Sequence, residues 1–118
     1  MHELLTIVET TAYLSRAEKL LEAGEREAIK LAIAADPLAG DLIRGSGGVR
    51  KLRFGLGGRG KRGGVRVVYY FHSERMPAFL LTVFAKNERS DLSQSEIATM
   101  RKLVTILVET YGQEPLER

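Results

Sequence analysis

The basic residues of this chain gather in one stretch that contains no acid. Between Leu42 and Ser73 lie eight of the eighteen lysines and arginines, namely Arg44, Arg50, Lys51, Arg53, Arg59, Lys61, Arg62 and Arg66. The same stretch holds nine of the twelve glycines, which let backbone N–H groups approach phosphate oxygens. A concentrated cationic field attracts a polyanion, so nucleic acid is the expected partner. A solvated basic loop with no specific role is the alternative.

Cations of this kind can carry out phosphate chemistry. RNA supplies its own nucleophile, the 2′-OH, so an enzyme need only position it, assist proton transfer and stabilise the charge of the transition state. Arginine stays protonated, whereas lysine can exchange protons when neighbouring cations lower its pKa. We expect Lys51, Arg53, Arg66 and Lys86 to meet if the strands that carry them pair. The alternative is that all four only bind a nucleic-acid backbone.

Other chemistries lack their residues. The chain has no cysteine, and His2 and His72 stand without a spaced cluster of ligands, so we expect no metal site and no cofactor. No Gly-x-Ser-x-Gly elbow is present. Lys61 is followed by Arg62 and not by Ser or Thr, which excludes a P-loop.

Length and composition indicate one folded domain over residues 1–118. The chain is 44% hydrophobic, and its formal net charge is only +3, so the basic signal lies in the distribution of charge. The N-terminus lacks the pattern of a signal peptide, and no apolar run approaches the ~20 residues that span a bilayer. We therefore expect a cytoplasmic protein without a membrane partner and without disulfides.

The first half of the chain predicts a strand and a helix hairpin. Residues 4–8 are apolar and rich in β-branched side chains, which is typical of a strand. A helix is expected from Thr10 or Thr11, with Gly24 as its break. A second helix is expected from about Glu25 to the Asp36–Pro37 pair.

The second half predicts three consecutive strands and a helix. The strands are expected at residues 49–54, 65–72 and 78–85, with a loop at 55–64. Ser93 followed by Glu96 is a capping-box signature, and a helix should continue from there to Gly112. The order predicts an α+β fold with a small antiparallel sheet, one face covered by helices and the other open and basic.

Three stretches resemble a known family: GDLI-x-GSGGVRKLRF, GRGKRGGVRVVYYF and LLTVFAKNERSDLS. They resemble the RelE/HigB toxins of type II toxin–antitoxin systems, in the RelE/ParE superfamily, over residues 35–96. The resemblance implies a RelE-like fold and a ribosome-dependent endoribonuclease, or mRNA interferase. Such an enzyme cleaves mRNA in the decoding site without a metal, inhibits translation and is neutralised by a cognate antitoxin.

The resemblance also implies site residues. Lys51 and Arg53 correspond to the paired basic residues of the family's second strand, Arg66 to the arginine after Gly-Gly-x, and Lys86 to the basic position where the last strand ends. Lys61 belongs to the Gly-Lys-x-Gly-Gly element of the HigB-like branch. We expect Arg66 to stabilise transition-state charge and Lys61 or Lys86 to assist proton transfer. The residues expected to contact RNA are Arg50, Arg59, Arg62, Asn87 and Arg89.

One departure and two alternatives stay open. Some RelE toxins place a tyrosine shortly after the last strand and an arginine just before it, where this chain has Ser93 and Asn87, so the general base is undefined. A ParE-like toxin that inhibits gyrase without cleaving RNA is one alternative. The other is a non-catalytic RNA-binding module, which would need exposed aromatic side chains for base stacking. We expect Tyr69 and Tyr70 to serve packing or hydrogen bonding instead.

Overall fold

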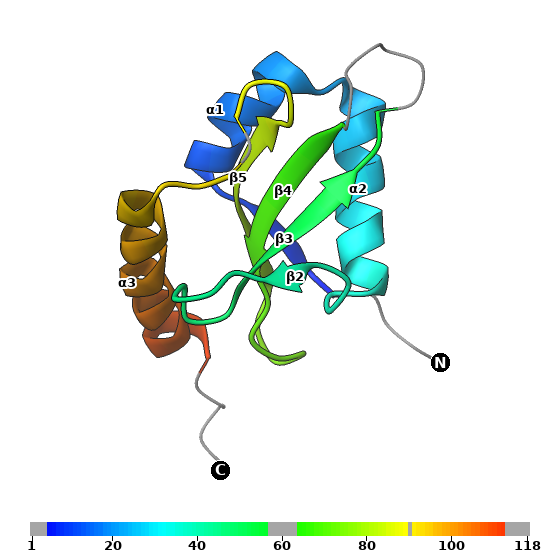
Figure 1. Cartoon of the computed structure of the whole chain (residues 1–118). Coiled ribbons are helices and arrows are strands. Elements are labelled where there is room, and N and C mark those ends of the chain that lie inside the picture. Colours follow the sequence, from blue (N-terminus) through cyan, green and yellow to red (C-terminus); the bar gives the residue numbers. More distant parts are fainter. Residues whose placement is uncertain (1–4, 57–63, 90, 113–118) are drawn as a thin grey trace.

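A computed structural model describes residues 5–56, 64–89 and 91–112. The elements in chain order are β1 (Ile7–Glu9), α1 (Thr11–Leu20), α2 (Ala23–Ala35), β2 (Asp41–Leu42), β3 (Val49–Phe54), β4 (Val65–Tyr70), β5 (Ala78–Ala85) and α3 (Gln94–Tyr111). Figure 1 shows one sheet with helices on both sides. The α+β class and the order of the main elements are as the sequence predicts.

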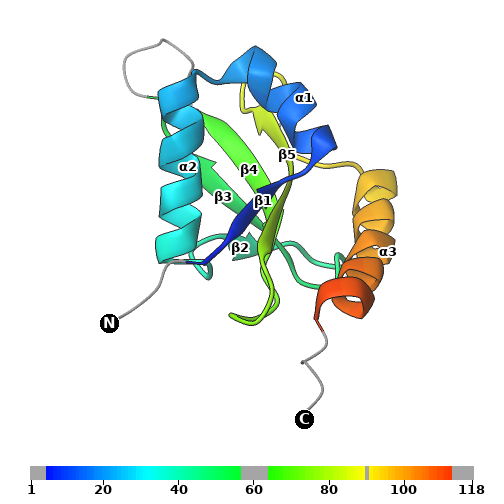
Figure 2. The same ribbon diagram turned by 180° about the vertical axis from the view of Figure 1, so that it is seen from behind.

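The sheet is mixed, whereas the sequence predicted an antiparallel one. Its strand order is β1-β5-β4-β3-β2, and the pairs from β5 to β2 are antiparallel. β1 lies parallel to β5, with Ile7 opposite Ala78. Figure 2 shows β1 at the edge of the sheet beside β5. The two-residue strand β2 was not predicted, because its pairing with β3 in a glycine-rich connection leaves no periodic pattern.

Helices α1 and α2 cover one face of the sheet. Tyr13, Ala17, Ile29 and Ile33 pack there against strand residues that include Val65, Val67 and Tyr69. The Thr10 hydroxyl caps α1 by accepting a hydrogen bond from the Tyr13 N–H.

The predicted break between the two helices at Gly24 is wrong, since Gly24 lies in the first turn of α2. The chain turns earlier, at Leu21 and Glu22. Leu21 is extended and buried, and Glu22 forms a capping box with Glu25. The burial of a leucine thus overrides the helix-breaking tendency of a glycine.

Helix α3 covers part of the opposite face, which the sequence pattern predicts to be open. Val104 and Leu107 pack with Val49, Tyr70 and Phe79. These strand residues form an apolar patch that would otherwise face water, so a helix shields it. Ser93 caps α3 through the predicted capping box, and Gly112 is its C-cap. The end of this face that carries Arg53 remains exposed.

Strand ends differ from the prediction by a few residues. β4 stops at Tyr70 instead of residue 72, and β1 spans Ile7–Glu9 instead of residues 4–8. Most of the predicted loop, residues 57–63, lies outside the described part of the chain. Gly64 immediately precedes β4 and has a φ of 63°. An added Cβ there would come within 2.2 Å of the Phe54 carbonyl oxygen. Only glycine fits that position. Among the described residues no helix is both long and apolar enough to cross a membrane.

Candidate nucleic-acid interface

Three arginines line up across the exposed end of the face that α3 partly covers. The register places Arg53 of β3 opposite Arg66 of β4, and Arg66 opposite Phe84 of β5. The guanidinium of Arg89 lies over the Phe84 ring, 5.3 Å from its centroid. We call Arg53, Arg66 and Arg89 the cationic row. Like charges directly opposite each other destabilise a sheet, so the arrangement favours an anionic ligand.

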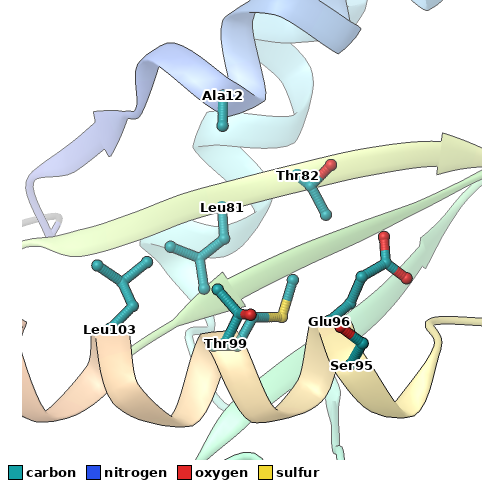
Figure 3. A pocket seen from close by; sticks show the side chains of 8 residues that line it. Ala12, Leu81, Thr82, Ser95, Glu96, Thr99 and Leu103 are labelled. Carbon is teal, nitrogen blue, oxygen red and sulfur yellow. The ribbon is translucent and has the colours of Figure 1, made fainter.

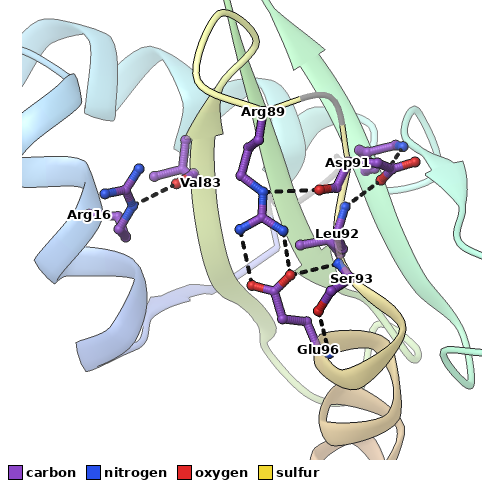
Figure 4. A network of polar contacts seen from close by, with 8 residues as sticks. Arg16, Val83, Arg89, Asp91, Leu92, Ser93 and Glu96 are labelled. Atoms are coloured by element: carbon purple, nitrogen blue, oxygen red, sulfur yellow. Dashed lines mark hydrogen bonds and ion pairs between the residues drawn. The ribbon is translucent and has the colours of Figure 1, made fainter.

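Arg89 is held on several sides. Its Nη1 and Nη2 groups donate to the two carboxylate oxygens of Glu96, and its Nε donates to the Asp91 carbonyl oxygen at 3.0 Å. Figure 4 shows the guanidinium and the carboxylate facing each other fork to fork. Such a bidentate pair fixes direction as well as distance.

Glu96 is fixed in turn by the start of α3. Its Oε1 accepts a hydrogen bond from the Ser93 N–H at 2.7 Å, and its own N–H donates to the Ser93 hydroxyl at 3.1 Å. The hydrogen bonds from Arg89, followed by the one from the Ser93 backbone, lower the pKa of Glu96 from its usual value near 4.5 to about 2. The carboxylate is therefore ionised at any physiological pH.

Lys51 lies on the same face as the row. Its cross-strand partner is Val68, and its Nζ donates to the Asp91 carboxylate at 2.9 Å. Asp91 also accepts from the Leu92 N–H at 2.8 Å, which ties the segment after β5 to β3. The hydrogen bond from Lys51 is the main cause of a lowered pKa at Asp91. This pair forms across 40 positions of sequence.

Lys86 and Asn87 are exposed in the turn after β5. The Lys86 N–H donates to the Gly64 carbonyl oxygen at 3.1 Å, which places this turn beside the start of β4. Within the described residues neither Arg53 nor Lys86 has an ion-pair partner.

Glu88 faces away from the row. Its carboxylate accepts from the Arg16 guanidinium at 2.8 Å and from the Ala85 N–H at 3.1 Å. Figure 4 shows Arg16 on the α1 side of β5, directed at the Val83 carbonyl. The negative charge of Glu88 is thus compensated at the edge of β5.

Arg50 does not join the other predicted site residues. It alternates to the opposite face, where its Nη1 donates to the carbonyl oxygens of Gly40 and Leu38 at 2.6 and 3.2 Å. The Tyr69 hydroxyl holds the same connection, donating to the Pro37 carbonyl and accepting from the Gly40 N–H. The predicted residues Arg59, Lys61 and Arg62 lie outside the described part of the chain.

The strand aromatics are packed and do not form a stacking platform. Tyr69, Tyr70, Phe79 and Phe84 are each at most 5% exposed. Burial raises the pKa of both tyrosines, and the Tyr70 hydroxyl lies 3.1 Å from His72 Nδ1. Phe84 contributes to the site through a cation–π contact between its ring and the Arg89 guanidinium.

A groove of about 290 Å³ runs beside the site between α1, β5 and α3. Its lining includes Leu81 at the floor and Met100 and Leu103 on α3. Figure 3 shows Glu96 at one end of this groove, with its side chain extending from α3 toward β5. No group of three or more His, Asp or Glu gathers as a metal site among the described residues.

Sequence reasoning missed three members of this site. Asp91 lies in a polar run after the last strand, Glu96 belongs to a capping box, and Phe84 lies in an apolar strand. None of these settings by itself indicates a binding site. Only the capping-box spacing of Ser93 and Glu96 could have drawn attention to this segment, and that pattern does not reveal the contact with Arg89.

The fold and the cationic row define a small α+β protein with a sheet end suited to a polyanion. Residues 10–117 match the family of the RelE toxin of the RelE/RelB toxin–antitoxin system. The chain belongs to this RelE toxin family. A mutant of the Escherichia coli toxin RelE in the free state has a similar fold, with a TM-score of 0.54 and 20% identity. That match covers 86% of this chain and 98% of the other.

Proposed function

We propose that this toxin is a ribosome-dependent endoribonuclease that cleaves mRNA in the decoding site and so inhibits translation. The observation that carries the proposal is the cross-strand pair of Arg53 and Arg66, two like charges held opposite each other at the exposed end of the sheet. Lys51 and Arg89 extend the same surface. An RNA phosphate bound between these cations would reduce the repulsion between them.

The proposed reaction uses the nucleophile of the substrate. The 2′-hydroxyl gives up its proton to solvent as its oxygen attacks the adjacent phosphorus, the bond from phosphorus to the 5′-oxygen breaks, and a 2′,3′-cyclic phosphate and a 5′-hydroxyl end result. Arg66 has Arg53 and Phe84 as its cross-strand neighbours, and in this proposal it stabilises the charge that develops on the phosphoryl oxygens. Lys86, or Lys61, supplies the proton that the leaving 5′-oxygen takes up.

The ribosome has a defined role in this proposal. Most of the cations in the described part of the chain lie near strand ends or in an exposed turn, where they can hold a phosphodiester without enclosing a nucleotide. In-line attack needs the 2′-oxygen, phosphorus and 5′-oxygen to be aligned, and the decoding site imposes that alignment on mRNA. The antitoxin expected for the family would then bind the cationic surface with an acidic and apolar segment.

Primer extension on mRNA bound to programmed ribosomes tests the proposal. We expect defined cleavage with ribosomes, none on naked mRNA, and no loss of activity when EDTA is added at a level that leaves enough Mg²⁺ for ribosome integrity. Efficient cleavage of naked RNA, or loss of cleavage on intact ribosomes with EDTA, would overturn it. A parallel DNA supercoiling assay distinguishes the ParE-like alternative, which predicts gyrase inhibition without RNA cleavage.

A further inference from the structure

We propose that Glu96 is a positioning residue that aims Arg89 at an RNA phosphate. This inference rests on the proposed function, because it assigns Glu96 a part in the same reaction. Arg89 would contact the substrate, and Glu96 would act only through Arg89.

The hydrogen bonds of Arg89 support this division of roles. A guanidinium has five N–H donors. Three of them are used within the protein, two on the Glu96 carboxylate and one on the Asp91 carbonyl oxygen. Within the described part of the chain one N–H on each of Nη1 and Nη2 has no partner. These two groups point to opposite edges of the planar guanidinium, so the side chain can still offer one donor to a phosphate while its orientation is fixed.

The location of Arg89 places those donors beside the centre of the row. The guanidinium lies over Phe84, and Phe84 is the cross-strand neighbour of Arg66. Phe84 is 2% exposed, so it is a rigid support. A phosphate bound at Arg66 would therefore lie within reach of Arg89.

The start of α3 provides the rigidity of Glu96. The capping box with Ser93 fixes both the backbone and the carboxylate of Glu96, and α3 is anchored to the sheet through Val104 and Leu107. An unsupported arginine at an exposed strand exit would lose rotamer entropy on binding a phosphate. A preorganised one loses less, and the gain appears in the rate when alignment is needed in the transition state.

Glu96 could instead only neutralise the charge of Arg89, and this alternative predicts a different effect of its removal. If the carboxylate only neutralises Arg89, then removing its charge strengthens RNA binding and raises the rate. If it positions Arg89, then removing its charge lowers the maximal rate and leaves binding nearly unchanged. The direction of the change in rate therefore separates the two roles.

A double-mutant cycle on ribosome-bound mRNA tests the inference. We would measure the maximal single-turnover rate and the half-saturating toxin concentration for wild type, E96Q, R89A and the double variant. We expect E96Q to lower the maximal rate about tenfold, with less than about a threefold change in half-saturation, and to have no further effect in the R89A background. R89K should behave like R89A, since an ammonium cannot form the bidentate pair.

Two controls separate positioning from folding. E88Q changes a neighbouring carboxylate that binds Arg16 and faces away from the row, so it should keep the wild-type rate. S93A removes the hydroxyl that caps the Glu96 N–H but keeps the Ser93 backbone N–H that binds the Glu96 carboxylate, so it should lower stability more than rate.

The inference is overturned if E96Q is as fast as wild type or faster, or if it lowers the rate equally with and without Arg89. Absence of any cleavage by the wild-type protein would instead overturn the proposed function.

Discussion

Arg66 should contribute more to cleavage than Arg53, although the two arginines are cross-strand partners. Arg66 is half-buried between two neighbouring strands, whereas Arg53 is exposed. Two unit charges at about 4 Å interact by about 1 kcal/mol in water and about 4 kcal/mol at the effective dielectric constant of a site near a protein surface. A phosphoryl charge at Arg66 should thus gain an intermediate amount, about 2 to 3 kcal/mol.

This difference sets the expected rates. Arg66→Ala should lower the single-turnover rate about 10²-fold, because each factor of ten corresponds to about 1.4 kcal/mol. Arg53→Ala should lower it only about fivefold, from a loss of about 1 kcal/mol. Quenched-flow cleavage of mRNA in the ribosomal A site at saturating toxin gives both rates, and thermal melting confirms that both variants are folded. Equal losses for the two variants, or a wild-type rate for folded Arg66→Ala, would refute the reasoning.

Three predictions concern stability. Arg53→Gln should stabilise the fold by about 0.3 kcal/mol in low salt by removing repulsion from Arg66, and urea unfolding near 1 M salt should show no difference. Tyr69→Phe should cost about 1 to 3 kcal/mol in urea unfolding, because it leaves the Pro37 carbonyl and the Gly40 N–H without their partner, and a cost below that of Tyr70→Phe would contradict this role. The pKa of Glu96 is lowered to about 2, so its pair with Arg89 stabilises the fold above pH 4.5 and is lost as the pH falls toward 2. Because the Glu96 side chain is 41% exposed, E96Q should cost only about 1 kcal/mol at neutral pH, and a cost that persists at pH 2 would rule out this linkage.

Local patterns predicted most of the elements. The dense β-branched and aromatic run of β4, the apolar run of β5 and the capping box before α3 each depend on neighbours within a few positions. The predicted break at Gly24 is wrong because the tendency of glycine to end a helix is weaker than the burial of a leucine. Leu21 is buried in an extended conformation, so the chain turns before Gly24.

The sequence by itself determined that cations gather on consecutive strands, that Arg53 and Arg66 belong to neighbouring strands, and that Lys86 follows the last strand. It also determined the family, through stretches that span most of the sheet. Alternation along β3 places Arg50 on the opposite face of the sheet from Lys51 and Arg53. The pattern does not indicate what Arg50 binds there, which is the connection before β3.

Only the tertiary structure decided which charges meet. The register between β3 and β4 sets Arg53 opposite Arg66, and the path of the chain after β5 brings Asp91 to Lys51 and Glu96 to Arg89. The parallel pairing of β1 and the cover provided by α3 were decided in the same way. Periodicity tells which side chains are buried, but the partners of a buried face or of a charge are chosen by packing among segments that are far apart in the chain. For this reason the sequence could indicate a cationic site, while the arrangement of its carboxylates and its aromatic support required the fold.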